Sequence, residues 1–231
     1  SLYDFTGEAL KPWAEAGYTC YAFDIQHEGW KIEGFGRDCG GSIHYRKADL
    51  HDHETLNAIQ DEFADKHVVF GMAFPVCTDM AVSGAAHFKR KAEKDPDFQT
   101  KAVNYAIWSA KLFNSMYIPY FIENPVSVLA TKWRKPDYNF HPYEYGGYIP
   151  DDQLEHPRWP EYIAPRDAYP KKTCLWTGGG FVMPTKVAVT VKKGYATQHL
   201  KLGGKSQRTK DIRSATPRGF AIAICEANKS C

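Results

Sequence analysis

The fold is decided by the stretch Ala73-Phe74-Pro75-Val76-Cys77-Thr78-Asp79-Met80-Ala81-Val82-Ser83-Gly84-Ala85. Cys77 follows an apolar run and a proline, and it precedes a polar turn and a Ser-Gly pair. Further along, Glu123-Asn124-Pro125 also follows an apolar run directly. We expect both to end buried strands at one edge of a parallel sheet, where open α/β sheets bind ligands. A thiol beside a carboxyl group suits covalent catalysis. Each motif alone also has an ordinary explanation. Cys77 can be a small buried apolar residue, and Glu123-Asn124-Pro125 can simply end a strand at a turn.

Strands and helices alternate on either side of this stretch. The apolar patterns predict strands over 19–23, 42–47, 67–74, 117–122 and 173–177, and helices over 8–16, 53–66, 98–116 and 217–227. This order indicates an α/β fold with a mostly parallel, doubly wound sheet. Three acids stand at strand ends, namely Asp24, Asp49 and Glu123. Nucleotide-binding sheets contact ribose and base from such positions, although Asp24 also suits a plain turn or helix cap.

Composition sets the remaining limits. The 231 residues suit one domain over 1–231, with an aromatic, proline-rich lid or loop at about 132–172 and a basic segment at about 192–213. The net charge of +2 neither favours nor excludes nucleic acid. The six cysteines form no C-x-x-C pair, which argues against zinc ribbons and redox motifs. His51, Asp52 and His53 are better explained by a strand end and helix cap, so we expect no metal.

The chain shows no signal peptide and no apolar run near the length of a membrane span. We therefore expect a soluble, cytoplasmic protein with no membrane partner. It begins at Ser1 without methionine, and we expect a few native residues to be missing there.

Short motifs follow one another in a characteristic order. They are Phe5-Thr6-Gly7, Asp24, Asp49, Phe74-Pro75-Val76-Cys77 with Ser83-Gly84, Glu123-Asn124-Pro125, Lys171-Lys172-Thr173 and Thr216-Pro217-Arg218-Gly219-Phe220-Ala221. Over nearly the whole chain, this order resembles the DNA cytosine-5 methyltransferases, specifically short phage-type members without a large recognition domain. Two features depart from the family pattern. Val76 interrupts its Pro-Cys dipeptide, and lysines replace the arginine of its next motif.

The resemblance implies a Rossmann-like methyltransferase fold, S-adenosylmethionine as cofactor, DNA as partner and action in the bacterial host cytoplasm. Cys77 would add to C6 of cytosine, Glu123 would hold N3 and the exocyclic amine, and Lys171 would stand in for the arginine. The site should lower the pKa of Cys77, through a lysine or a helix N-terminus. We expect Val76 to bulge ahead of the thiol without misplacing it. The implied cofactor contacts are Phe5, Gly7, Asp24, Asp49, Phe74 and Pro75.

The basic segment has two interpretations. Lys201, Lys205 and Arg208 are our candidates for nucleic-acid phosphate contacts, because the segment holds seven basic residues against one acid. A solvated loop would have the same composition. The aromatic residues of the 132–172 segment likewise suit either base stacking or loop packing.

Three functions remain open at this point. The first is methylation of cytosine C5 in DNA, and the second is the same chemistry on a mononucleotide or a modified base. The third is a non-catalytic module of the same fold that binds DNA, cofactor or a partner. Methyltransferases that act on exocyclic amines fit less well, because Phe74-Pro75-Val76-Cys77 lacks their leading polar residue and trailing aromatic.

Overall fold

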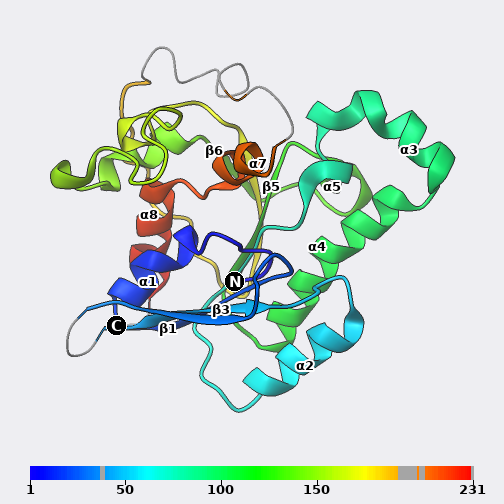
Figure 1. The fold of residues 1–231 in the computed structure, drawn as a ribbon, viewed down its shortest axis with the longest axis horizontal. Helices are drawn as coiled ribbons and strands as arrows, with labels where there is room; N and C mark the ends of the chain where they lie inside the picture. The colour runs from blue at the N-terminus through cyan, green and yellow to red at the C-terminus, as the bar shows by residue number, and fades with distance from the viewer. Residues whose placement is uncertain (37–39, 192–201, 203–205, 230–231) are drawn as a thin grey trace.

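Two mixed β-sheets form the centre of the molecule (Figure 1). The computed structural model describes residues 1–36, 40–191, 202 and 206–229. The three-stranded sheet has the order β1 (Thr19–Asp24), β3 (Ser42–Lys47) and β2 (Trp30–Gly34). The four-stranded sheet has the order β4 (Gly71–Ala73), β5 (Tyr120–Pro125), β7 (Thr173–Gly178) and β6 (Tyr138–Phe140). The pairs β1–β3 and β4–β5 are parallel, whereas β2, β7 and β6 each run antiparallel to a neighbour.

Helices surround these sheets. The α-helices described are α1 (Lys11–Glu15), α2 (His53–Phe63), α3 (Phe88–Lys94), α4 (Phe98–Ser115), α5 (Leu129–Lys132), α7 (Gln207–Ser214) and α8 (Arg218–Asn228). Short 3-10 helices are η1 (Glu8–Leu10), η2 (Cys77–Asp79), η3 (Val82–His87), η4 (Pro142–Tyr148), η5 (Asp151–Gln153) and η6 (Pro165–Asp167). Local signals explain several boundaries: Asp52 caps α2 by accepting from Glu54 N and Thr55 N, and Pro12 lies in the first turn of α1.

Alternate residues of the strands face two separate apolar cores. Phe121 packs with α1 and α8, whereas its neighbour Ile122 packs with α2 and α4. Met72 and Ala73 divide between the two cores in the same way. Because successive strand residues point to opposite faces, the two cores lie on opposite sides of the strands. Figure 1 shows the helices arranged accordingly, with α1 and α8 on one side and α2 and α4 on the other.

The first residues of the chain lie between the two sheets. Leu2 forms isolated parallel bridges with Phe23 of β1 and with Ala73 of β4. Its backbone N–H donates to Met72 O at 2.8 Å, and Phe23 N–H donates to Ser1 O at 2.9 Å. This segment therefore connects the two sheets and leads directly into the Phe5–Gly7 loop.

The α/β class predicted from the sequence is confirmed. The mostly parallel, doubly wound sheet is not confirmed: both sheets are mixed, because the strands after β5 return antiparallel and β2 forms an antiparallel edge. The predicted strand over 67–74 is shorter than expected, since only Gly71–Ala73 pairs with β5. The sequence patterns missed β2 and β6. In the described part of the chain, no helix has the length and apolar character that crossing a bilayer requires.

Candidate active site

The turn that carries Cys77 follows β4 and opens a single 3-10 turn. Cys77 starts η2, and its carbonyl accepts from Met80 N at 3.0 Å and from Ala81 N at 2.8 Å. Val76, the residue that interrupts the Pro-Cys pattern, is 51% exposed, and Cys77 is half-buried. The extra residue therefore turns its side chain outward and leaves the thiol on the turn beside β5.

A buried hydrogen bond joins this turn to the end of β5. Asn124 Nδ2 donates to Pro75 O at 3.0 Å, and the Asn124 side chain is almost fully buried. Its Oδ1 has no hydrogen-bond partner among the described residues. A buried amide is costly to leave unpaired, so the Nδ2 contact holds the turn firmly against β5. The sequence prediction that Cys77 and Glu123-Asn124 lie at one edge of a sheet is consistent with this contact.

Cys77, Glu123 and Lys171 act on one another electrostatically. Burial raises the pKa of the Cys77 thiol, the Glu123 carboxylate raises it further, and Lys171 lowers it. Burial also raises the pKa of Glu123, against the opposing effect of Lys171. The expectation that the site lowers the pKa of Cys77 is therefore wrong for this structure. Burial and the neighbouring carboxylate outweigh the lysine.

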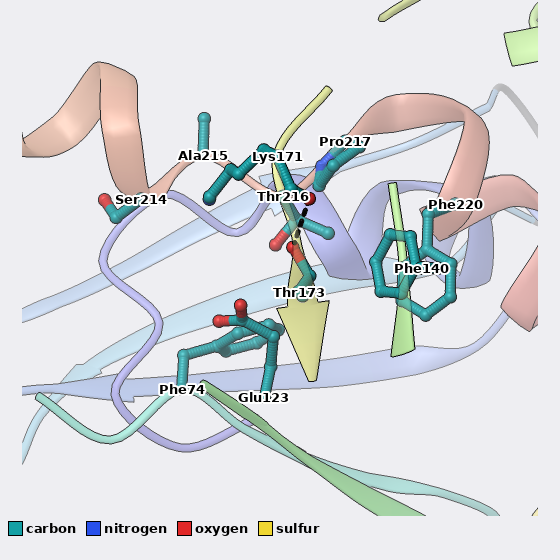
Figure 2. A pocket seen from close by; sticks show the side chains of 10 residues that line it. All are labelled: Phe74, Glu123, Phe140, Lys171, Thr173, Ser214, Ala215, Thr216, Pro217 and Phe220. Atoms are coloured by element: carbon teal, nitrogen blue, oxygen red, sulfur yellow. Dashed lines mark hydrogen bonds between the residues drawn. The ribbon is translucent and has the colours of Figure 1, made fainter. Parts of the chain in front are cut away.

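Glu123 and Lys171 line a narrow pocket together with aromatic residues (Figure 2). Phe74, Phe140 and Phe220 contribute apolar walls, and Ser214 to Pro217 run along another side. Its free volume of about 10 Å³ is that of a single water molecule. Lys171 Nζ donates to Arg213 O at 2.8 Å, at the end of α7. A planar base can enter only if Lys171 or the segment after α7 moves.

The acids of the expected cofactor pocket lie at neighbouring strand ends. Asp24 ends β1 and is 7% exposed, and its Oδ1 accepts from Gln26 N at 2.8 Å and Gln26 Nε2 at 3.2 Å. Asp49 is exposed beyond β3, with Oδ1 accepting from His51 N at 3.0 Å. Burial raises the pKa of the Tyr3 hydroxyl, and Tyr105, Asp49 and Asp24 raise it further. Both acids therefore lie within electrostatic reach of Tyr3.

The Phe5–Gly7 loop has a conformation that suits only glycine at its last position. Gly7 has φ +66° and precedes η1, and a Cβ there would lie 2.6 Å from the Tyr45 hydroxyl oxygen. Its N–H donates to Asp4 Oδ1 at 2.8 Å. Phe5 is 39% exposed and stacks on His27 with ring centroids 5.6 Å apart. Phe74 and Pro75, the remaining predicted cofactor contacts, belong to the Cys77 turn.

Two glutamines that the sequence patterns did not single out connect Asp24 to α7. Gln207, the first residue of α7, donates from Nε2 to Gln26 Oε1 at 2.7 Å. Gln26 in turn donates to Asp24, and the last turn of α7 holds Lys171. Thus α7 reaches from the Asp24 side to the Lys171 side. No local pattern in the sequence reveals a side-chain contact between residues so far apart along the chain.

Of the three residues predicted to contact nucleic acid, one lies among the residues that the structure describes. Lys201 and Lys205 lie outside the described residues. Arg208 lies on the exposed side of α7, with its guanidinium 5.7 Å from the Tyr162 ring centroid. Its contact with nucleic acid stays a prediction.

A second basic region, which the sequence patterns did not single out, adjoins the Cys77 turn. Helix α3 exposes Lys89, Arg90 and Lys94. On the same helix, Lys91 Nζ donates to Thr78 O at 3.3 Å and to the Asp79 carboxylate. Four basic residues between positions 89 and 94 indicate this basic surface in the sequence.

Within the described ranges, no group of three or more His, Cys, Asp or Glu side chains is arranged to hold a metal ion. Comparison of the chain with protein-family models, curated proteins and solved structures gives no match.

Proposed function

We propose that the protein transfers a methyl group from S-adenosylmethionine to C5 of cytosine in DNA, through a covalent adduct on Cys77. The observation that supports this proposal is that Glu123 and Lys171 line one pocket and both act electrostatically on Cys77, whose turn is held to β5 by the Asn124–Pro75 hydrogen bond. A thiol, a carboxyl group of raised pKa and an ammonium group at one strand edge provide a nucleophile, a proton donor and a cation.

The chemistry requires C5 of cytosine to become a nucleophile. The Cys77 thiolate forms a bond to C6, and the electron pair of the C5–C6 double bond moves into the ring. Glu123 delivers its proton to N3, which the raised pKa of this carboxyl group favours. After C5 has gained the methyl group, solvent water takes the C5 proton, as it takes the thiol proton when the Cys77 thiolate forms, and the restored C5–C6 double bond expels Cys77 as thiolate. Glu123 takes back the N3 proton.

The protonation state of Glu123 also affects how readily Cys77 forms a thiolate. The raised pKa of Cys77 means that the free thiol keeps its proton at neutral pH. When Glu123 is protonated, its negative charge no longer opposes the thiolate. Lys171 then stabilises the thiolate without competition. We therefore place activation of Cys77 after cytosine has entered and paired with Glu123.

Residues on the Asp24 side fit S-adenosylmethionine, which supplies an electrophilic methyl group when bound. Asp24 already accepts two hydrogen bonds from Gln26 on one oxygen, an arrangement that ribose hydroxyls can replace. Gly7 packs against the Tyr45 ring, so a larger residue there would displace Tyr45 from beside this loop. We assign Asp24 to the ribose, Asp49 to the adenine amino group, and Phe5 and the Phe74-Pro75 turn to the walls. In this proposal the two sheets belong to a Rossmann-like methyltransferase fold.

A second candidate is a non-catalytic module of the same fold. The observations that favour it are the raised pKa of Cys77 and a pocket with room for one water molecule. A module of this kind would bind cofactor or DNA without forming an adduct.

Labelled methyl transfer separates these functions. The protein is incubated with radiolabelled S-adenosylmethionine and duplex DNA, deoxycytidine monophosphate or buffer. Label in DNA supports the proposed enzyme, and label only in the nucleotide indicates the same chemistry on a smaller substrate. In parallel, DNA that contains 5-fluorocytosine should trap a covalent adduct, because fluorine cannot leave as a proton does. Binding of cofactor or DNA without label transfer or adduct would leave the non-catalytic module.

A further inference from the structure

Strand β2 forms an open edge of the three-stranded sheet. Within the part of the chain that the structure describes, it pairs with β3 alone. Phe35 N–H donates to Gly41 O at 2.9 Å, and Lys47 N–H donates to Gly29 O at 3.2 Å. Backbone groups that face the neighbouring strand alternate along an antiparallel pair, so the odd-numbered residues of β2 face β3. The even-numbered residues turn their N–H and C=O groups away from the sheet, and they are Trp30, Ile32 and Gly34.

One face of this edge carries exposed apolar side chains. Trp30 is 70% exposed and Ile32 is 54% exposed. The Trp30 ring leans over β3, with its centroid 6.0 Å from that of His44. The space above Gly34 is open, because a Cβ there would meet no described atom within 4 Å outside its chain neighbours. An edge strand with outward backbone groups and exposed apolar side chains is a template for pairing with another chain.

The other face of β2 carries two opposite charges. The Tyr45 hydroxyl donates to Glu33 Oε2 at 3.0 Å, and Lys31 Nζ lies 5.4 Å from the Tyr45 ring centroid. Successive side chains of a strand point to opposite faces, so both charges lie on the side away from Trp30 and Ile32. They flank Ile32 symmetrically. In an antiparallel arrangement about Ile32, the strand is therefore complementary in charge to itself.

We propose that two copies of the chain pair through β2, antiparallel, with Ile32 on the two-fold axis. Ile32 then lies opposite Ile32 of the second copy, and Trp30 lies opposite Gly34 of the second copy. The outward backbone groups of both strands satisfy one another in hydrogen-bonded pairs. The indole of Trp30 covers the open space above the second copy's Gly34, and the three-stranded sheets of the two copies become one continuous sheet.

Charge selects this register over its alternatives. Lys31 of each copy lies opposite Glu33 of the other, at positions where the Cα atoms are only about 4.5 Å apart. A two-fold axis at Lys31 or at Glu33 would instead bring like charges directly opposite, which is destabilising. An axis at Trp30 or Gly34 would place neither charge opposite the other. Because this complementarity lies within one strand, the partner it specifies is a second copy of the same strand.

Charge reversal tests the pairing. Sedimentation velocity over a series of concentrations should show a dimer of the wild-type chain. Lys31→Glu and Glu33→Lys each place like charges opposite one another and should weaken self-association by about tenfold or more. An equimolar mixture of the two variants brings unlike charges together again and should restore a dimer. Lys111→Glu, which reverses an exposed charge on α4, should associate as the wild type does.

Three outcomes of this experiment would overturn the proposal. The first is a wild-type chain that stays monomeric up to about 1 mM, where even weak complexes form. The second is a dimer that Lys31→Glu leaves unchanged, since its interface would lie elsewhere. The third is a mixture that associates no more tightly than either variant alone. The mixture also separates the loss of an interface from misfolding, because two misfolded chains would not restore each other's dimer.

Disulfide trapping tests the register. Opposed residues of a hydrogen-bonded pair have Cα atoms about 5.5 Å apart, within the range that disulfides span. Ile32→Cys should therefore form a covalent dimer with oxidised glutathione, which accepts the two thiol hydrogens and is reduced as the S–S bond forms. Trp30→Cys should not, because the two copies of residue 30 lie about 13 Å apart along the strands. Equal cross-linking in both variants, or none in either, would overturn the proposed register.

Discussion

The two sides of the candidate active site are held in different ways. On one side, the Cys77 turn is fixed to β5 by the Asn124–Pro75 hydrogen bond, which lies fully inside the protein. On the other side, Lys171 is held through Arg213 O by α7, a helix that buries only Thr209 and Ile212. A nucleophile must keep its position, whereas a pocket with room for one water must open to admit a base. Under the proposed function, the Cys77 side should stay rigid and the Lys171 side should move.

The largest expected effect comes from the nucleophile itself. Cys77→Ser should abolish the adduct with 5-fluorocytosine DNA and reduce methyl transfer by at least about a thousandfold, since catalytic nucleophiles account for effects of this size or more. Cofactor affinity, measured by calorimetry, should stay unchanged because the thiol attacks the base. Cys225→Ser is the control, because Cys225 lies on the buried face of α8, in the core that α8 shares with α1. Full activity of the Cys77→Ser protein would refute the covalent mechanism.

Removal of the buried hydrogen bond tests whether the Cys77 side is the rigid one. Asn124→Ala leaves Pro75 O without its partner and should lower the free energy of unfolding by about 1–3 kcal/mol, measured by denaturant titration. Asn57→Ala, an exposed position on α2, should change stability by less than about 0.5 kcal/mol. Equal effects of the two substitutions would mean that the Asn124–Pro75 hydrogen bond contributes no more to the free energy of unfolding than an exposed side chain does.

The cofactor acid should have an effect of similar size on binding alone. Asp24→Ala should weaken S-adenosylmethionine binding by about 1–3 kcal/mol, the scale of removing a hydrogen bond to a charged group. Calorimetry on the folded variant measures this directly. Gln26→Ala, which removes only the side chain that donates to Asp24, should not weaken binding. Unchanged affinity in Asp24→Ala would count against the assigned pocket.

Titration of Cys77 measures the electrostatic coupling across the site. Its pKa is raised above 9.0 by burial and then by Glu123, so its alkylation by iodoacetamide should accelerate as the pH rises beyond 9. Glu123→Gln removes a negative charge and should lower the pKa of Cys77. Lys171→Gln removes a positive charge and should raise it. Shifts of the same sign in both variants would show that Cys77 does not lie between these two charges.

Glu123 makes the free energy of unfolding depend on pH. The sign of this dependence is opposite to that of a carboxylate in an ordinary ion pair. A carboxyl group of raised pKa binds its proton more tightly in the folded protein than in the unfolded chain. Its contribution to stability is therefore complete below the unfolded pKa of 4.5 and disappears as the pH rises through the folded pKa. Denaturant titrations at several pH values should show this decline in the wild type and a smaller one in Glu123→Gln, which keeps Asp4 and Asp167, two carboxyl groups whose pKa burial also raises. The same pH dependence in both proteins would assign it to another group.

The smallest effect concerns the basic surface. Replacing Lys201, Lys205 and Arg208 by Gln should flatten the dependence of log K on log salt by about 0.9 for each DNA phosphate that the variant no longer binds. Replacing Lys31, Lys111 and Lys229 removes the same charge from other exposed positions and should leave the slope nearly unchanged. Identical slopes in the two variants would identify the predicted segment as a solvated loop.

Strand-end reasoning predicted more of the candidate site than of the fold around it. Cys77 lies in the turn after β4, and Glu123-Asn124 lie in the second half of its parallel neighbour β5 rather than beyond its end. The apolar runs that lead into both motifs can be recognised in a sequence. The mixed character of the sheets could not be recognised, since β2 shows little apolar alternation and β6 has three residues. Charge alone suggested a lowered pKa for Cys77. Burial reverses the sign, and the burial of a side chain depends on elements that lie far away in the sequence.

The backbone and the side chain of Val76 are under different constraints, which a sequence comparison would not distinguish. Its backbone is needed to place Cys77 at the start of η2, but its side chain is 51% exposed and contributes little to packing. The chemical identity of residue 76 is therefore free to vary during evolution while the length of the turn is not. A small fluorophore attached at this position would lie next to the nucleophile without displacing the core, and would report directly on the arrival of a base.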